Sequence, residues 1–365
     1  MSIILFIIIL LVLVLVHEFG HFIVAKKNGI RVDEFGFGFP PRAAKLFKKN
    51  GTLYTLNWIP FGGFVKIFGE DGDETVLSDE DKKSSFTSKP RYVQAGVLVA
   101  GIVFNILLAW LLYSVGFMSG LPASTASVPA DVQLSSAQLT LIEVDATGPA
   151  FRAGLIPGDV IVSIADEKTS IAKPSVDDLI TFVKAHPNKN ISVTYNRATV
   201  EKTISITPAV GITGATTGGI GVTPDMVGTL KLPFFKAFYS GAKLTIAKMR
   251  ETIVGFGQLI SGHQNLSDVA GPVGLVSIVG QAYHFGWSYL ISFVALISIN
   301  LAVINLVPFP ALDGGRLLFL LIEKIKGSRI KAQTTNIVNA VGFFILIGLM
   351  LVITYHDIVR MFVHK

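Results

Sequence analysis

Four stretches of the chain consist almost entirely of apolar residues, at approximately 3–25, 93–118, 287–307 and 338–355. Each approaches or exceeds the roughly 20 residues that an α-helix needs to cross a lipid bilayer. The segment between the second and third stretches, about 121–286, is less hydrophobic and is punctuated by Gly, Pro, Ser and Thr. The pattern therefore predicts an α-helical polytopic membrane protein with about four transmembrane helices and an inserted domain.

The first apolar stretch must be distinguished from a secretory signal peptide. It has no basic region in front of it and is longer than the apolar core of such a peptide. Its positive charges come after it, at Lys26 and Lys27. We therefore expect a retained span whose N-terminus lies outside the cytoplasm.

Lys and Arg are concentrated in two segments beside the predicted spans. Residues 26–91 contain twelve of them. A shorter group follows the third span, at Lys324, Lys326, Arg329 and Lys331. Loops with excess positive charge beside membrane spans stay in the cytoplasm. We therefore expect a multi-pass membrane protein with both termini and the segment 121–286 extracytoplasmic.

Composition narrows the function classes. Hydrophobic residues make up 51% of the 365 residues and charged residues only 15%, which excludes an ordinary soluble protein. The formal net charge of +6 is modest, and the basic residues lie beside the spans, so we expect contact with lipid and no nucleic-acid partner. The chain has no cysteine, which excludes disulfides and thiolate metal sites.

The inserted segment is expected to contain a small folded domain followed by a helix. From Pro233 to Gly262, Phe, Leu and Ile residues are interspersed with Lys and Arg. This pattern predicts an amphipathic helix on the outer face of the membrane, and the alternative is a helix packed on the external domain. The expected divisions are an N-terminal membrane part at 1–120, a domain at 121–226, a helical connector at 227–286 and a C-terminal membrane part at 287–365.

Two strand-like runs, 52–58 and 64–68, flank the turn-forming segment 59–63 in the first basic loop. Runs of this kind around Pro and Gly predict a β-hairpin. The hairpin has many aromatic residues for a loop in water. We therefore expect it to dip into the membrane, where exposed backbone is tolerated only against protein or a wet cavity.

Two histidines and a glutamate interrupt the first apolar stretch, at His17, Glu18 and His21. Ionisable groups inside a span are costly unless they are paired. Residues four apart lie on one face of a helix, so both imidazoles can reach one ion. This is the H-E-x-x-H pattern of zinc hydrolases, with two His ligands and a Glu that acts as general base on the zinc-bound water. The alternative is polar pairing between helices.

A third ligand is expected where the third apolar stretch is interrupted by Pro308 and Pro310. Catalytic zinc generally has three protein ligands and one open position. Asp313 follows the prolines and precedes Lys324 by eleven residues, while His17 precedes Lys26 by nine. At ~1.5 Å per helical residue, both side chains lie on the order of 13–17 Å from the basic boundary.

Two alternatives stay open at this segment. Asp313 is also suited to be the N-cap of a helix that begins near Gly315. Asn305 precedes Asp313 by eight residues and is a candidate to bind the substrate backbone or a developing oxyanion. A helix–helix hydrogen bond is the plainer role for Asn305.

In these residues the chain resembles the site-2 protease family of intramembrane zinc metalloproteases, and within it the bacterial RseP-like group with a single PDZ domain. The resemblance is carried in order by His17–His21, Gly36–Pro40, Pro60–Lys66, Ala100–Asn105, Gly271–Gly274 and Asn305–Gly315. The family often has Gly-Pro-x-x-Asn in its second span, and here position 102 is Ile. This departure leaves the bend of the second span open.

The resemblance implies a function and a set of site residues. Zn²⁺ would be held by His17, His21 and Asp313, with Glu18 as the base. Asn305 and the hairpin residues would bind substrate; those hairpin residues are Phe61, Gly62, Gly63 and Phe64. The substrates would be single-pass membrane proteins cut within their transmembrane segments, such as anti-sigma factors or remnant signal peptides. An upstream site-1 protease would often act first.

The external domain resembles a PDZ domain of the bacterial, protease-associated kind. The resemblance is carried by Gly148–Ile161, by a helix opening at 176–179, and by the Gly-Gly-Ile-Gly-Val run at 218–222. It implies either capture of peptide strands or chain ends, or a filter against bulky external domains.

Two other function classes also stay open. A membrane scaffold with a structural metal site would need four protein ligands, and the sequence offers three. A metal transporter would be expected to show polar residues in several spans and inverted repeats. We therefore expect an enzyme.

Overall fold

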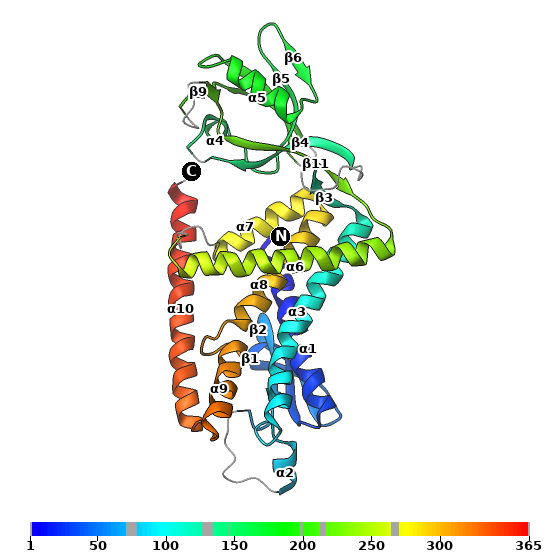
Figure 1. Ribbon diagram of the computed structural model, residues 1–365, viewed down its shortest axis with the longest axis vertical. Coiled ribbons are helices and arrows are strands. Elements are labelled where there is room, and N and C mark those ends of the chain that lie inside the picture. Colours follow the sequence, from blue (N-terminus) through cyan, green and yellow to red (C-terminus); the bar gives the residue numbers. More distant parts are fainter. Residues whose placement is uncertain are drawn as a thin grey trace. The chain divides into compact units, whose positions relative to one another are not determined.

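The computed structural model describes residues 2–70, 79–125, 134–145, 147–197, 200–211, 217–263 and 270–363. It divides into two compact units (Figure 1). The first consists of Met1–Ser114, Phe238–Tyr283 and Ile291–Lys365, and the second of Val115–Ala237 with His284–Leu290. Each unit is described below by itself.

Among the described residues, four helices are long and apolar enough to cross a membrane, which agrees with the number predicted from the sequence. They are α1 (Ser2–Lys27), α3 (Arg91–Ser119), α8 (Trp287–Leu306) and α10 (Ala332–Val363). The last helix extends beyond the predicted 338–355 at both ends, because the flanking polar residues continue the same helix. The other helices described outside the sheet domain are α2 (Asp79–Ser84), α6 (Phe234–Ile260), α7 (Pro272–Phe285) and α9 (Asp313–Lys326).

Helix α6 is the amphipathic helix that the sequence predicts. Figure 1 shows it lying across the direction of α3 and α10. The indole Nε1 of Trp110 in α3 donates a hydrogen bond to the carbonyl of Phe238 (2.8 Å). Gly241 lies so close to Ser114 that a Cβ there would be 2.4 Å from the hydroxyl. A glycine in α6 thus allows the two helices to touch.

Two long strands, β1 (Val32–Lys49) and β2 (Thr52–Ile67), form an antiparallel hairpin in the first unit. Both bend, and residues 34–37 of β1 each have two partners, one within 63–66 and one within 53–56. The segments of the two bent strands therefore form a small sheet. In the described part of the chain, residues 63–67 are an edge strand of this sheet. The prediction that 52–58 pairs with 64–68 was wrong, because both runs belong to β2 and pair with β1.

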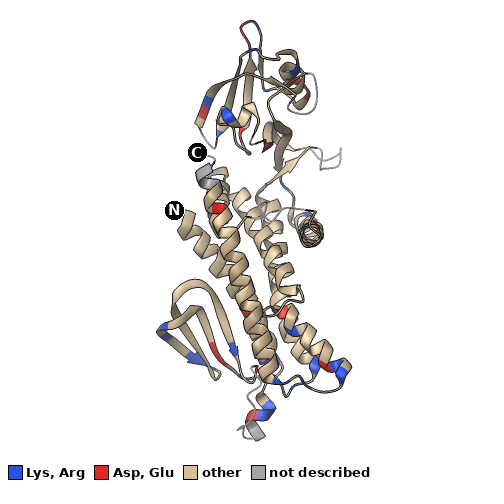
Figure 2. Cartoon of the chain, turned by 90° about the vertical axis from the view of Figure 1, so that its left-hand side faces the viewer, with Lys and Arg blue, Asp and Glu red and all other residues tan. Residues whose placement is uncertain are grey.

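Within the first unit, Lys and Arg collect on the hairpin, on α2 and at the far end of α9, whereas the spans carry few charges (Figure 2). The last turns of α1, α2 and α9 contain six of them: Lys26, Lys27, Lys82, Lys83, Lys324 and Lys326. The basic residues that flank the spans thus gather at one end of this unit.

The second unit is built on a seven-stranded sheet with the order β3-β11-β4-β5-β7-β8, in which β6 pairs with β5. Its strands are β3 (Leu121–Ser124), β4 (Ser135–Val144), β5 (Val160–Ala165), β6 (Ser170–Ala172), β7 (Ile191–Arg197), β8 (Val200–Ile206) and β11 (Val222–Leu230). A short pair, β9 (Ala209–Val210) and β10 (Gly218–Gly219), stands apart. Helices α4 (Pro149–Arg152) and α5 (Val176–Ala185) complete the unit, and its core contains Leu141, Ile164 and Phe182.

An ion pair between a buried carboxylate and a partly exposed guanidinium holds the turn before β5. The side chain of Asp159 is fully buried and accepts two hydrogen bonds from Arg197, from Nε at 2.8 Å and from the Nη2 nitrogen at 2.7 Å. It also accepts the backbone N–H of Ile156 (3.0 Å). The hydrogen bonds to Asp159 raise the pKa of the Arg197 guanidinium. The turn in the Gly148–Ile161 segment is thereby tied to β7.

Candidate metal centre

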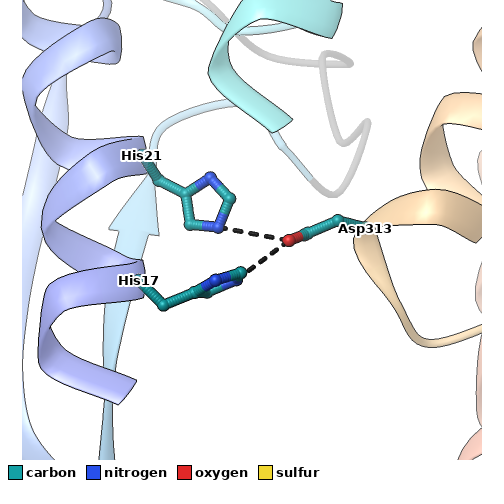
Figure 3. Close-up of side chains that lie close together, drawn as sticks. All are labelled: His17, His21 and Asp313. Carbon is teal, nitrogen blue, oxygen red and sulfur yellow. Dashed lines mark hydrogen bonds and ion pairs between the residues drawn. The ribbon is translucent and has the colours of Figure 1, made fainter. Parts of the chain in front are cut away.

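Three side chains from the two ends of the chain converge in the first unit (Figure 3). His17 and His21 project from one face of α1 toward Asp313 at the start of α9. The Asp313 Oδ2 atom lies 2.9 Å from His17 Nε2 and 3.4 Å from His21 Nε2. Both imidazoles are buried, with exposed fractions of 6% and 7%.

Glycines at the crossing of α1 and α3 make room for the imidazoles. A Cβ on Gly20 would lie 2.5 Å from the carbonyl oxygen of Ala100. A Cβ on Gly101 would lie 2.5 Å from His21 Nε2 and 2.8 Å from His17 Cε1. Glycine inside a helix costs up to about 1 kcal/mol relative to alanine. The close approach of the α3 backbone to Gly20, and of the two imidazoles to Gly101, explains why glycine stands at these two positions despite this cost.

The other nitrogen of each imidazole has a partner on α3. His21 Nδ1 donates to the carbonyl oxygen of Val97 (2.8 Å). His17 Nδ1 lies 3.2 Å from the Nδ2 atom of Asn105. Partners of this kind orient histidines that bind metals. Both Nε2 atoms are therefore turned toward Asp313.

Asp313 is positioned by the interrupted segment between α8 and α9. Helix α8 ends at Leu306, as the two prolines predict, and α9 begins at Asp313 with Leu312 in the N-cap position. The alternative that Asp313 caps a helix starting near Gly315 is wrong, because its carboxylate contacts His17 instead. Gly314 packs directly under the carbonyl groups that end α8, where a Cβ would clash.

The donor set fits a zinc ion. The three ligand atoms all lie within 4.8 Å of one another. Zinc bonds of about 2.0–2.2 Å in a tetrahedral arrangement separate ligand atoms by about 3.4 Å. The distances of 2.9 and 3.4 Å from Asp313 to the two imidazoles are close to that value. Two imidazoles and one carboxylate are also the ligand types that catalytic zinc uses.

Glu18 lies beside this cluster and contacts the hairpin. Its Oε2 atom accepts the backbone N–H of Val65, at 3.1 Å, from the edge segment 63–67. Gly62 and Gly63 of the same strand pack against Val14 and Leu15 of α1. The strand edge and the glutamate are thus directly connected.

The remaining predicted substrate residues lie in two places. Phe61 to Phe64 lie where β2 bends, next to α1. Asn305 lies in the last turn of α8 and is half-buried. Their contact with substrate stays a prediction.

Sequence reasoning did not assign Gly101, Val97 or Asn105 to the site. Two signals were present, since Gly101 and Asn105 are a helix-breaking and a polar residue inside an apolar stretch. Neither residue type indicates which residues of α1 lie opposite Gly101 and Asn105. The backbone carbonyl of Val97 gives no signal at all.

A family model described as Peptidase family M50 matches residues 5–349. The chain belongs to this family. A putative zinc metalloprotease of Nostoc sp. is 36% identical over 96% of this chain and 93% of its own length. The regulator of sigma-W protease RasP of Bacillus subtilis is 31% identical over 99% of both chains. A PDZ domain of an SdrC-like protein from Listeria monocytogenes matches 26% of this chain and 93% of its own, with 20% identity and a TM-score of 0.22, too low to carry an argument.

Family membership confirms the main prediction from the sequence. The chain is a zinc metalloprotease of the site-2 protease family, and its cofactor is Zn²⁺. With four apolar helices it is a multi-pass membrane protein. The scaffold and transporter alternatives are set aside because the relatives are named as proteases.

Proposed function

We propose that this protease cleaves the transmembrane segments of single-pass membrane proteins. His17, His21 and Asp313 hold the zinc ion, and Glu18 is the general base. The observation that carries the proposal is the convergence of the three donor atoms between the apolar helix α1 and the start of α9, with His17 nine residues before Lys26 at the basic end of α1. A metal centre at this depth serves a bond that lies within the bilayer.

Each residue has a part in peptide hydrolysis. Bound zinc supplies Lewis-acid polarisation and lowers the pKa of water to about 7. Glu18 takes the proton of the attacking water and delivers it to the leaving amine. The N–H of Val65 holds Oε2 of Glu18, which leaves its second oxygen free for the proton. Asn305 donates to the substrate backbone or to the developing oxyanion.

The hairpin is proposed to bind the substrate as an added strand. In the described part of the chain, residues 63–67 pair with β1 on one side only. An extended peptide can add to such an edge through backbone hydrogen bonds. A substrate helix must unwind to do so, and this exposes the amide that is cut. Phe61, Gly62, Gly63 and Phe64 lie at the start of this edge.

The charge distribution supports the membrane orientation. The basic ends of α1, α2 and α9 belong on the cytoplasmic side by the positive-inside rule. The domain at 121–226, the connector at 227–286 and both termini are then extracytoplasmic. The membrane is the cytoplasmic membrane of a bacterium. Helix α6, with its apolar residues and lysines, is placed at the outer face.

The sheet domain is proposed to be a PDZ domain that admits substrates. A cleft of about 140 Å³ lies between α5 and the segment 218–224. Its walls include Leu179, Val183 and Ile220. An extended peptide end fits a groove between a helix and a strand. Substrates of the anti-sigma factor type, trimmed first by another protease, are consistent with the Bacillus subtilis relative named for sigma-W regulation.

Replacing Glu18 by Gln tests the proposed base. We expect E18Q to bind zinc as the wild type does, because the carboxylate is not a ligand. Cleavage of a tagged single-pass membrane protein should fall by about 10²–10⁴-fold, the usual contribution of a general base. The measurement is product formation in membranes alongside the zinc content of the purified protein.

The matched control is E251Q, which neutralises an exposed glutamate on α6 that pairs with Lys248. It should cleave at the wild-type rate. Wild-type cleavage by E18Q would show that another group is the base. Loss of zinc from E18Q would instead contradict the proposal that Glu18 is not a zinc ligand.

A further inference from the structure

Asn105 is a buried amide beside the candidate metal centre. It lies in α3, its side chain is fully buried, and its Nδ2 atom is 3.2 Å from His17 Nδ1. Its Oδ1 atom finds no hydrogen-bond partner among the residues that the structure describes. A buried polar atom without a partner is destabilising, because it has given up its hydrogen bonds to water and gains none in return. The orphaned oxygen therefore needs an explanation.

The present hydrogen bonds define one tautomer of His17. An amide nitrogen can only donate, so His17 Nδ1 must accept from Asn105. The proton of the neutral imidazole is then on Nε2, which donates to Asp313 at 2.9 Å. This arrangement pairs both nitrogens of His17 but leaves Oδ1 of Asn105 without a hydrogen bond.

Metal binding requires the other tautomer. When Nε2 binds zinc, the imidazole proton must be on Nδ1, which then needs an acceptor. A half-turn of the Asn105 amide brings Oδ1 to face Nδ1 and gives the orphaned oxygen its partner. An amide is suited to both states, since it offers a donor and an acceptor of nearly equal shape.

The second histidine provides a contrast. His21 Nδ1 faces the carbonyl oxygen of Val97, which can only accept. His21 is therefore held with its proton on Nδ1 in both states. The backbone of Asn105 is itself held, because Ser298 in α8 donates to its carbonyl oxygen (2.8 Å). The side chain can turn while the backbone stays in place.

We propose that Asn105 is a positioning residue for His17 whose amide turns over when zinc binds, so that it accepts from Nδ1 in the loaded enzyme and sets the affinity for the metal. The proposal rests on the proposed role of His17 as a ligand.

The test is a zinc titration of the metal-stripped full chain in detergent, against a chelator of known affinity. N105L keeps the volume but loses the acceptor, and its zinc affinity should fall about 10–100-fold, as for other partners of metal-bound histidines. N105D restores an acceptor and should bind zinc within a few-fold of the wild type. S298A removes a buried hydroxyl from the same hydrogen-bond chain without touching His17, and should bind normally.

The outcomes separate this proposal from the proposed ligand set. Zinc affinity equal to the wild type in N105L, or lower in N105D than in N105L, would overturn the role of Asn105. H17A serves as the reference for the ligand set. Wild-type affinity in H17A would mean that His17 is not a ligand, whatever the Asn105 variants show.

A spectroscopic measurement tests the change of tautomer. In ¹⁵N spectra of metal-free protein at neutral to mildly alkaline pH, His17 of the wild type should carry its proton on Nε2. In N105D the proton should be on Nδ1, because a carboxylate only accepts. A proton on Nδ1 in both proteins would contradict the turnover of the amide.

Discussion

At the scale of single residues, the site depends on two glycines as much as on its metal ligands. Gly101 faces both imidazoles at a distance where a Cβ cannot fit, and Gly20 does the same for the backbone of α3. The pattern His17, Glu18 and His21 is visible in the sequence because residues four apart share a helix face. The partners on α3 are not visible, since they depend on how two helices cross. The spacing along α1 is predictable from the sequence, and the contacts between α1 and α3 are not.

Replacing Gly101 by Ala tests this requirement. The new methyl group would displace both imidazoles, and a shift of about 1 Å in a catalytic group can cost 10²-fold in rate. We expect cleavage to fall by about that factor and zinc content to fall with it. G96A is the matched control, because Gly96 lies on the same helix with open space around it. Equal activity of G101A and G96A would rule out the requirement.

At the scale of elements, the hairpin connects substrate binding to the base. Its existence was predicted from strand-like runs around a Pro/Gly turn, but its pairing was not. The second half of β1 is basic and is preceded by Gly36, Gly38 and two prolines, which do not indicate a strand. Long-range pairing with β2 gives it that structure. The contact from Val65 to Glu18 follows from this pairing and could not be predicted without it.

Replacing Val65 by Pro tests the contact by removing its N–H. This N–H points to Glu18 and so is not part of the ladder with β1, and proline is tolerated on such edges. Hydrogen bonds to charged groups contribute about 1.5–3 kcal/mol, so cleavage should fall about 10–100-fold. Zinc content should be unchanged. V65A retains the N–H and should remain active; inactivity of V65A to the same degree would assign the effect to the side chain.

At the scale of the whole molecule, the apolar runs predicted the four spans and the place of the inserted domain. These features follow from the hydrophobicity of long stretches of sequence. They can be predicted without knowing which residues are in contact. The contact of Asp313 with His17, 296 residues away, was predicted from the proline-interrupted third span, from the equal depth of the two residues and from the family resemblance. In a membrane protein, the number of residues between a side chain and the charged end of its span gives the depth of that side chain in the membrane, and this number can be counted in the sequence. The order of strands in the second unit has no such marker.

The most direct test of the account is an anomalous difference map, recorded at the zinc edge, from crystals of the zinc-loaded full chain. The account predicts a single strong peak within bonding distance of His17 Nε2, His21 Nε2 and a carboxylate oxygen of Asp313. A strong peak elsewhere, or an Asp313 side chain turned away from the two imidazoles, would contradict it.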